Sequence, residues 1–198
     1  MSVNIMQGYR MEKDFGIDLG EDWFSYPVLY SNVAFDFPDG STFVELGSWK
    51  GRSANYMGRM LHNAGKKNTK LYCIDTWEDA PHHNLTGDQL YAQFLNNTSM
   101  FSNIIAIRQR TASASLLFPD CSVDFVFVDA GHDYESVMTD LRLWAPKVRL
   151  GGLLAGHDYD SHPDVRKAVA DFLGDHEKDL SDPRGECCFI MQKANKHE

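Results

Sequence analysis

Two kinds of apolar pattern alternate along the chain. Short, nearly continuous apolar runs bounded by glycine or polar residues favour strands, and they cover residues 42–46, 70–75, 104–109, 124–129, 153–156 and 187–192. Each of the first five runs is followed by apolar residues at helical spacing, in residues 51–61, 87–100, 111–118, 134–145 and 163–172. Because strands and helices alternate, the sequence predicts a single-domain α/β fold with a mostly parallel, doubly wound sheet.

The two ends of the chain fit this pattern less well. Residues 1–40 contain eight aromatic residues, which is too many for a disordered tail. We expect a short helix or turn at residues 22–31, within an arm that either packs on the main domain, residues 41–198, or covers its ligand pocket. At the other end, we expect the strand at residues 187–192 to pair with a weak strand near residues 178–180.

The turn after the first apolar run carries the strongest ligand-binding signal. Its Glu45, Gly47 and Gly51 match neither the G-x-G-x-x-G fingerprint of dinucleotide sites nor a phosphate-binding P-loop. An acid at this place repels phosphate but suits ammonium and hydroxyl groups. The free N–H groups of the helix start, up to Ser53, suit a small carboxylate. A ligand with an amino-acid end and a nucleoside end, such as S-adenosylmethionine, therefore fits this turn.

Further candidate residues for the same ligand follow the second and third runs. Asp75 ends the second run, where an acid can accept both hydroxyls of a ribose. We expect Trp77 on the loop after it, and Thr111 and Ala112 after the third run, to surround the adenine. Together with Glu45, Gly47 and Ser53, they make up the predicted cofactor site.

Several motifs together resemble a known enzyme family. They are residues 43–47, 74–77, 128–134 and 156–159, with Asp140, Trp144, Pro146 and the glycine pair 151–152 between them. Over residues 42 to about 173, the chain resembles class I S-adenosylmethionine-dependent methyltransferases, in the branch that includes macrolide sugar O-methyltransferases. The resemblance implies a Rossmann-like, mostly parallel seven-stranded sheet, S-adenosylmethionine as the cofactor, and O-methylation of a hydroxyl on a small polar molecule such as a sugar.

The resemblance also assigns chemistry to the ends of the fourth and fifth strands, which are neighbours about 4.8 Å apart in this family. Asp129 follows the fourth strand, whereas His157 and Asp158 follow the fifth, where the family carries an acidic pair. These three residues are expected to hold a divalent metal, magnesium or manganese, and the imidazole favours an ion softer than magnesium. His132, just before a helix start, is expected to stay neutral and to take the hydroxyl proton, so Asp129 and His132 are the predicted catalytic residues.

Composition restricts the partners. The net charge of −9 argues against nucleic acid and anionic membranes, and no apolar stretch approaches the length of a transmembrane helix. The N-terminus lacks a signal-peptide pattern, and the four cysteines form no C-x-x-C motif, so reduced thiols in a cytoplasmic protein are expected. The expected partners are a small-molecule acceptor and, through the aromatic arm, a second copy of the chain.

Other activities are compatible with the same motifs. A metal-free N-methyltransferase would use the same cofactor without an ion. A catalytically silent module would keep the S-adenosylmethionine site and transfer nothing. A nicotinamide-dependent dehydrogenase on a similar sheet is disfavoured, because the G-x-G-x-x-G fingerprint is missing.

Overall fold

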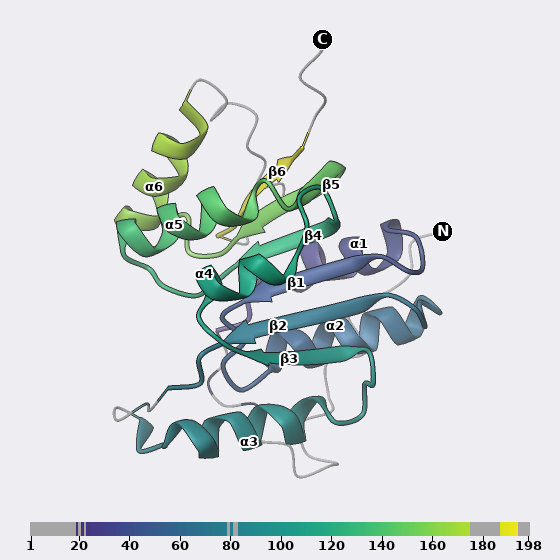
Figure 1. The fold of residues 1–198 in the computed structure, drawn as a ribbon. Helices are drawn as coiled ribbons and strands as arrows, with labels where there is room; N and C mark the ends of the chain where they lie inside the picture. Colours follow the sequence, from purple (N-terminus) through teal and green to yellow (C-terminus); the bar gives the residue numbers. More distant parts are fainter. Residues whose placement is uncertain are drawn as a thin grey trace.

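A six-stranded sheet forms the centre of the computed structural model, which describes residues 19, 21, 23–78, 80, 83–174 and 187–193. The strands are β1 (Thr42–Leu46), β2 (Lys70–Asp75), β3 (Ile104–Arg108), β4 (Val123–Val128), β5 (Val148–Gly156) and β6 (Phe189–Gln192). They lie in the order β3-β2-β1-β4-β5-β6, and every neighbouring pair is parallel except β5 and β6. The arrows of the five parallel strands therefore end at one edge of the sheet (Figure 1).

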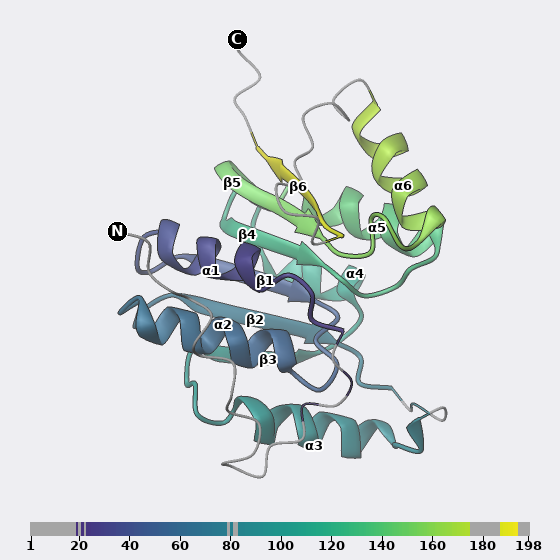
Figure 2. The same ribbon diagram turned by 180° about the vertical axis from the view of Figure 1, so that it is seen from behind.

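Helices cover both faces of this sheet, as the two opposite views show (Figures 1 and 2). One face carries α1 (Pro27–Asp36), α2 (Arg52–Asn63) and α3 (Gly87–Thr98). The other face carries α4 (Thr111–Ala114) with the short 3-10 helix Ser115–Leu117, α5 (Tyr134–Trp144) and α6 (Pro163–Leu173). Each layer of helices buries its own hydrophobic cluster against the sheet, which gives the three layers of a doubly wound α/β fold.

Strand β1 shows how one strand serves both faces. Its side chains alternate, so Phe43 joins the cluster under α1 and α2, whereas Val44 and Leu46 join the cluster under α5 and α6. All three are fully buried, as a central strand covered on both sides requires. By the same alternation Glu45 faces α1, where Tyr30 donates a hydrogen bond to it, so a carboxylate lies inside an apolar layer.

Local sequence signals fix where several helices begin. At α3, Thr86 and Gln89 form a capping box, in which each side chain accepts a hydrogen bond from the other residue's backbone amide. Asp133 accepts a hydrogen bond from the amide of Ser136 at 3.0 Å and so caps the N-terminus of α5. Pro163 opens α6 in its first turn, where its missing N–H group costs no helical hydrogen bond.

The mostly parallel, doubly wound sheet is confirmed, and some details differ. The described residues form six strands rather than seven. β6 pairs with β5, and its expected partner near residues 178–180 lies outside the described residues. The first helix spans Pro27–Asp36 rather than residues 22–31, because Pro27 fixes a helical φ at its first turn. β5 begins at Val148 rather than at residue 153, since an irregular register against β4 takes the glycine pair into the strand.

The aromatic arm is described only from its C-terminal part. Residues 1–18 lie outside the description, whereas Leu29, Tyr30 and Val33 of α1 are buried in the core cluster under α1 and α2. A role of the arm as a lid or as a contact with a second copy therefore stays a prediction. Among the described helices, none has the length and apolar character needed to cross a bilayer.

Candidate active site

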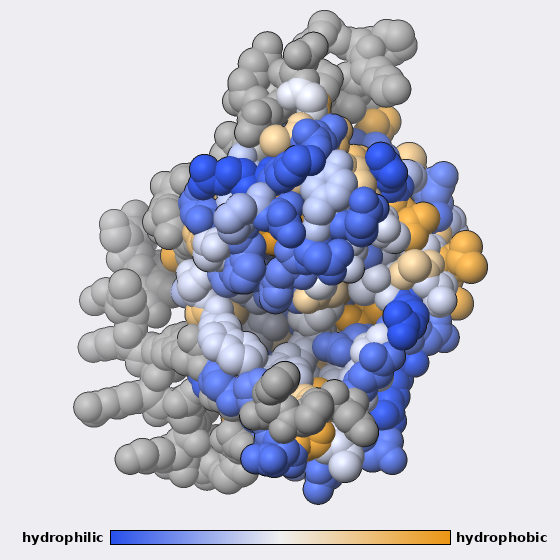
Figure 3. All heavy atoms as spheres, turned by 90° about the vertical axis from the view of Figure 1, so that its left-hand side faces the viewer, coloured by the Kyte–Doolittle hydropathy of each residue, from blue (hydrophilic) through white to orange (hydrophobic). Residues whose placement is uncertain are grey.

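The carboxyl ends of the parallel strands border a cavity of about 1050 Å³. This volume suits a ligand of nucleoside size, since small-molecule sites commonly measure about 300–1,000 Å³. Figure 3 looks onto this edge and shows a hollow surrounded mainly by hydrophilic residues. Eight of the predicted site residues line it: Gly47, Asp75, Thr111, Ala112, Asp129, His132, His157 and Asp158.

The turn after β1 is pressed against the end of β4. Gly47 has a φ of 83°, and a Cβ added there would lie 2.0 Å from the carbonyl oxygen of Asp129. Only glycine combines this left-handed conformation with so close an approach. Gly51, also at φ 83°, forms the cap of α2, and a Cβ there would lie 2.9 Å from the Phe94 ring. The two glycines therefore shape the turn, and Gly47 leaves its backbone exposed to the cavity.

Asp75 holds this turn in place from the neighbouring strand. Its Oδ2 accepts hydrogen bonds from the amides of Ser48 at 3.0 Å and Trp49 at 2.9 Å, and its Oδ1 accepts one from the amide of Trp77 at 2.8 Å. Burial raises the pKa of Asp75, although the three amides act in the opposite direction. The carboxylate thus orders two loops and also forms part of the cavity wall.

Glu45 and Ser53 lie behind the turn and not among the residues that line the cavity. Glu45 is fully buried, and its Oε2 accepts a hydrogen bond of 2.7 Å from the Tyr30 hydroxyl. Its Oε1 has no hydrogen-bond partner among the described residues. Burial raises the pKa of Glu45 to about 7, since the nearby hydroxyls of Ser48, Tyr30 and Ser53 only partly offset the loss of hydration. A buried carboxylate oxygen without a donor is a fitting partner for an ammonium group.

Trp77 also lies outside the cavity wall. Its ring is fully buried and packs against Tyr91 and Phe94, with ring centroids 4.8 and 4.7 Å away. The indole Nε1 donates a hydrogen bond of 2.7 Å to the backbone oxygen of Trp49. Trp77 therefore stabilises the turn after β1 through this hydrogen bond. Thr111, by contrast, borders the cavity, and its hydroxyl donates to Asp140 at 2.6 Å.

His132 lies between two carboxylates at the ends of β4 and β5. Its Nε2 is 2.9 Å from Oδ2 of Asp158 and 4.0 Å from Oδ1 of Asp129. These two partners raise the pKa of His132 to about 10, despite partial burial. The expectation of a neutral imidazole is therefore wrong for the ligand-free arrangement, because two adjacent carboxylates outweigh the helix dipole. Burial raises the pKa of Asp129, whereas for Asp158 the histidine hydrogen bonds outweigh burial and lower the pKa.

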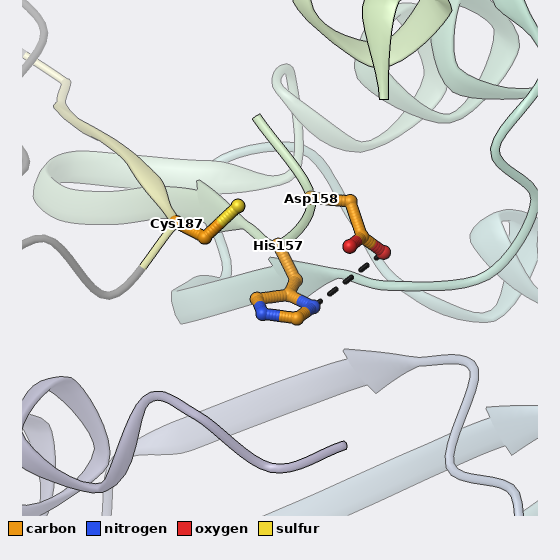
Figure 4. A group of neighbouring side chains, drawn as sticks. All are labelled: His157, Asp158 and Cys187. Atoms are coloured by element: carbon orange, nitrogen blue, oxygen red, sulfur yellow. Dashed lines mark ion pairs between the residues drawn. The ribbon is translucent and has the colours of Figure 1, made fainter. Parts of the chain in front are cut away.

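His157 approaches the same carboxylates from the end of β5. Its Nδ1 lies 3.7 Å from Oδ1 of Asp129 and 3.5 Å from Oδ2 of Asp158, while its Nε2 is 2.8 Å from the hydroxyl of Ser25. Burial alone would lower the pKa of His157, but the adjacent Asp158 and Asp129 raise it. The Ser25 contact leaves Nδ1 directed at the two carboxylates, as Figure 4 shows for Asp158.

These distances allow a divalent cation to be held. Two ligand atoms about 2.1 Å from an ion at a tetrahedral angle lie about 3.4 Å apart, and His157 is near this distance from both aspartates. The ligand atoms of Asp129, His132 and Asp158 also lie within 4.8 Å of one another. Carboxylate and imidazole donors together suit manganese, iron or zinc better than magnesium. The residues present therefore fit a metal ion of intermediate softness.

Local sequence patterns missed three aromatic or polar residues of this site. The Tyr26 hydroxyl donates a hydrogen bond of 2.9 Å to Oδ2 of Asp129, and Ser25 contacts His157. Trp23 borders the cavity beside Trp49. Tyr26 and Asp129 are separated by 103 positions, so no short motif links them. The dense aromatic residues of the N-terminal arm were the only signal that pointed toward such contacts.

Comparisons with known proteins agree with this architecture. A family model described as "Methyltransferase domain" matches residues 44–159. The uncharacterized protein R132 of Acanthamoeba polyphaga mimivirus is 26% identical over 159 residues, which are 72% of this chain and 66% of that protein's length. The chain therefore spans slightly less than two thirds of this relative.

Solved structures share the fold at low sequence identity. The O-methyltransferase NovP is 16% identical, with a TM-score of 0.64 over 86% of this chain and 80% of that one. A putative rRNA methylase from Clostridium thermocellum is also 16% identical, with a TM-score of 0.62 over 86% of this chain and 96% of that one. At these identities, the similarity establishes a common fold and leaves the acceptor undetermined.

Proposed function

The chain belongs to the methyltransferase-domain family and is a class I enzyme that uses S-adenosylmethionine, and from this premise we propose that it methylates a hydroxyl of a small polar, sugar-like molecule. The observation that carries the proposal is the convergence of Asp129, His132, His157 and Asp158 beside the Gly47 turn. O-methylation requires a group that takes the hydroxyl proton next to the methyl donor. His132 lines the same cavity as Gly47, which is why this role is proposed for it.

Charge and site chemistry indicate the acceptor class, because the fold is shared by enzymes with different acceptors. A net charge of −9 opposes binding of the RNA backbone. The resemblance of the motifs to macrolide sugar O-methyltransferases supports a sugar-like hydroxyl. A small molecule also suits a cavity of about 1050 Å³ that must hold the cofactor as well.

The cofactor is assigned to the residues around the turn after β1. When bound, S-adenosylmethionine supplies a methyl group activated by a sulfonium. Glu45 has an unpartnered buried oxygen that suits the ammonium of its methionine end, with Gly47 and Ser53 alongside. Asp75 faces the cavity and is proposed to accept the ribose hydroxyls, with Thr111 and Ala112 near the adenine. Trp77 is proposed to act indirectly, through its hydrogen bond to Trp49.

Proton removal is assigned to His132. Asp129, His157 and Asp158 are proposed to hold a divalent cation, which when bound supplies Lewis acidity that favours the ionised hydroxyl. Asp129 and Asp158 are also the carboxylate partners of His132. When the charge of these carboxylates is neutralised, the imidazole holds its proton less tightly. Once it has released its own proton to solvent, neutral His132 can accept the hydroxyl proton while the oxygen attacks the methyl group in line.

The test compares His132→Gln with the exposed control His62→Gln, which lies in the last turn of α2. Methyl transfer from labelled S-adenosylmethionine to a panel of small polyhydroxylated acceptors is measured, together with calorimetric binding of the cofactor. We expect His132→Gln to lower transfer at least about 100-fold and to keep cofactor affinity within about threefold. Equal transfer rates in the two variants would eliminate His132 as the base.

Chelation separates the proposed reaction from the alternatives. Loss of transfer in a strong chelator, with recovery on addition of manganese, is expected for the metal-assisted route. Transfer to amines that is insensitive to chelators would support a metal-free N-methyltransferase. Cofactor binding without transfer to hydroxyl or amine acceptors would support a silent binding module.

A further inference from the structure

A sulfur donor lies next to the proposed nitrogen and oxygen ligands of the cation. Cys187 precedes β6, and its sulfur, one nitrogen of His157 and one carboxylate oxygen of Asp158 all lie within 4.8 Å of one another. Figure 4 shows the thiol of Cys187 on the left and the carboxylate of Asp158 on the right, with the imidazole of His157 lower and between them. The sequence contained no C-x-x-C or C-x-x-H pattern that would have suggested this thiol as a ligand.

The fold brings these residues together through the antiparallel pairing of β5 and β6. Gly156 pairs with Phe189, so the residues that leave β5 lie beside those that enter β6. The amide of Tyr159 donates a hydrogen bond of 3.1 Å to the backbone oxygen of Cys187, which fixes the two segments to each other. The thiol is therefore held beside Asp158 by backbone contacts.

The backbone has an uncommon conformation at Asp158 and at Cys187, and this conformation sets the direction of both side chains. Asp158 has a φ of 61° and Cys187 a φ of 58°, both in the left-handed region that non-glycine residues rarely adopt. The amide of Asp160 lies 3.3 Å from the sulfur of Cys187 and donates to it. An amide N–H directed at sulfur supports negative charge there, as a thiolate ligand requires.

His157 is oriented for the same purpose. Its Nε2 is 2.8 Å from the Ser25 hydroxyl, which leaves Nδ1 on the side of Asp158 and Asp129. A second partner on the remote ring nitrogen is how proteins fix the tautomer and direction of a ligating imidazole.

We propose that Cys187 is a ligand of the cation held by His157 and Asp158, and that this site selects a thiophilic ion such as zinc, iron(II) or cobalt(II) over magnesium. The inference rests on the proposed cation site and names the class of ion that it takes. When the sulfur binds the ion, the thiol proton is released to solvent and no electron is transferred. A set of sulfur, nitrogen and oxygen donors disfavours magnesium, which prefers oxygen ligands alone.

Cobalt(II) titration of the full chain tests this assignment, because a thiolate bound to cobalt gives a near-ultraviolet charge-transfer band that oxygen and nitrogen ligands do not. The wild type and Cys121→Ser are expected to show the band, since Cys121 is an exposed free cysteine that precedes β4, at the opposite end of that strand from Asp129. Cys187→Ser is expected to lose the band and to bind zinc at least about tenfold more weakly, with its affinity for magnesium unchanged.

The outcomes distinguish this inference from the function on which it rests. Cobalt binding without a thiolate band in the wild type, or a band that survives in Cys187→Ser, would overturn the role of Cys187 and leave the cation site standing. Absence of any cobalt or zinc binding would overturn both the cation site and this inference. Calorimetric binding of S-adenosylmethionine, measured on the same samples, reports the cofactor site independently. Cys187→Ala, measured alongside and checked by thermal melting, must behave as the serine variant does.

Discussion

Replacing Glu45 with glutamine tests whether a buried carboxylate limits the stability of the ligand-free protein. Burial raises the pKa of Glu45 from 4.5 to about 7. Between these values the folded protein keeps a proton on Glu45 that the unfolded chain has already released. The free energy of unfolding contributed by this group must therefore fall as the pH rises from about 4.5, and the loss is complete just above about 7.

The size of the effect follows from the pKa difference. At 1.36 kcal/mol per pKa unit, a rise from 4.5 to about 7 corresponds to about 3 kcal/mol, most of which develops between about pH 5 and about pH 8. Burial raises the pKa values of the neighbours Tyr26, Tyr30 and Cys73 above ordinary values of 10, 10 and 9, so they stay neutral in this range. Asp129 also titrates at a raised pKa, but it is present in both proteins.

The measurement is urea unfolding of wild type and Glu45→Gln at about pH 5 and about pH 8. The variant is expected to gain about 2 to 3 kcal/mol relative to wild type between the two pH values. Any cost of an unpartnered amide N–H group is the same at both and cancels. Exposed Glu78→Gln is the control, with an expected change below about 1 kcal/mol. A stability difference for Glu45→Gln that is equal at both pH values would refute the reasoning.

Three further substitutions test the site. Gly47→Ala should lower the free energy of unfolding by more than about 2 kcal/mol, because φ is 83° and the added methyl group would meet the Asp129 carbonyl. Gly40→Ala is the control in the same urea assay, and it should lower the free energy of unfolding by less, because Gly40 has a φ of 93° but open space around it. Asp75→Ala should weaken calorimetric binding of S-adenosylmethionine at least about tenfold, since it removes the acceptor of three backbone amides, and unchanged affinity would remove the assignment. Tyr26→Phe should lower kcat about tenfold with little change in cofactor affinity, because it frees Asp129 from its 2.9 Å hydrogen bond, and a purely structural role would instead lower thermal stability alone.

Some of the site follows from patterns that act over a few residues. The apolar runs ending at Leu46, Ile74 and Val128 place the next residues at the carboxyl edge of a parallel sheet, which is why Asp75 and Asp129 were found from the sequence. Gly47 was found because a tight turn between a strand and a helix needs its conformation. Such assignments depend only on local periodicity and backbone sterics, and residues close together in the sequence determine both.

Other features were decided by tertiary packing. The depth at which Glu45 is buried depends on α1 covering β1, and the inward direction of Trp77 depends on the aromatic residues of α3. The raised pKa of His132 depends on Asp158, which lies 26 positions later in the chain, at the end of a different strand.

The contacts of Tyr26 with Asp129 and of Cys187 with Tyr159 depend on helix placement and strand register. The sequence by itself determined which residues stand at the strand ends, because the period of two and the turn chemistry are local. Only the tertiary structure decided which of these side chains share a proton or a hydrogen bond, because those interactions fall off within a few ångströms while the chain separations span tens of residues.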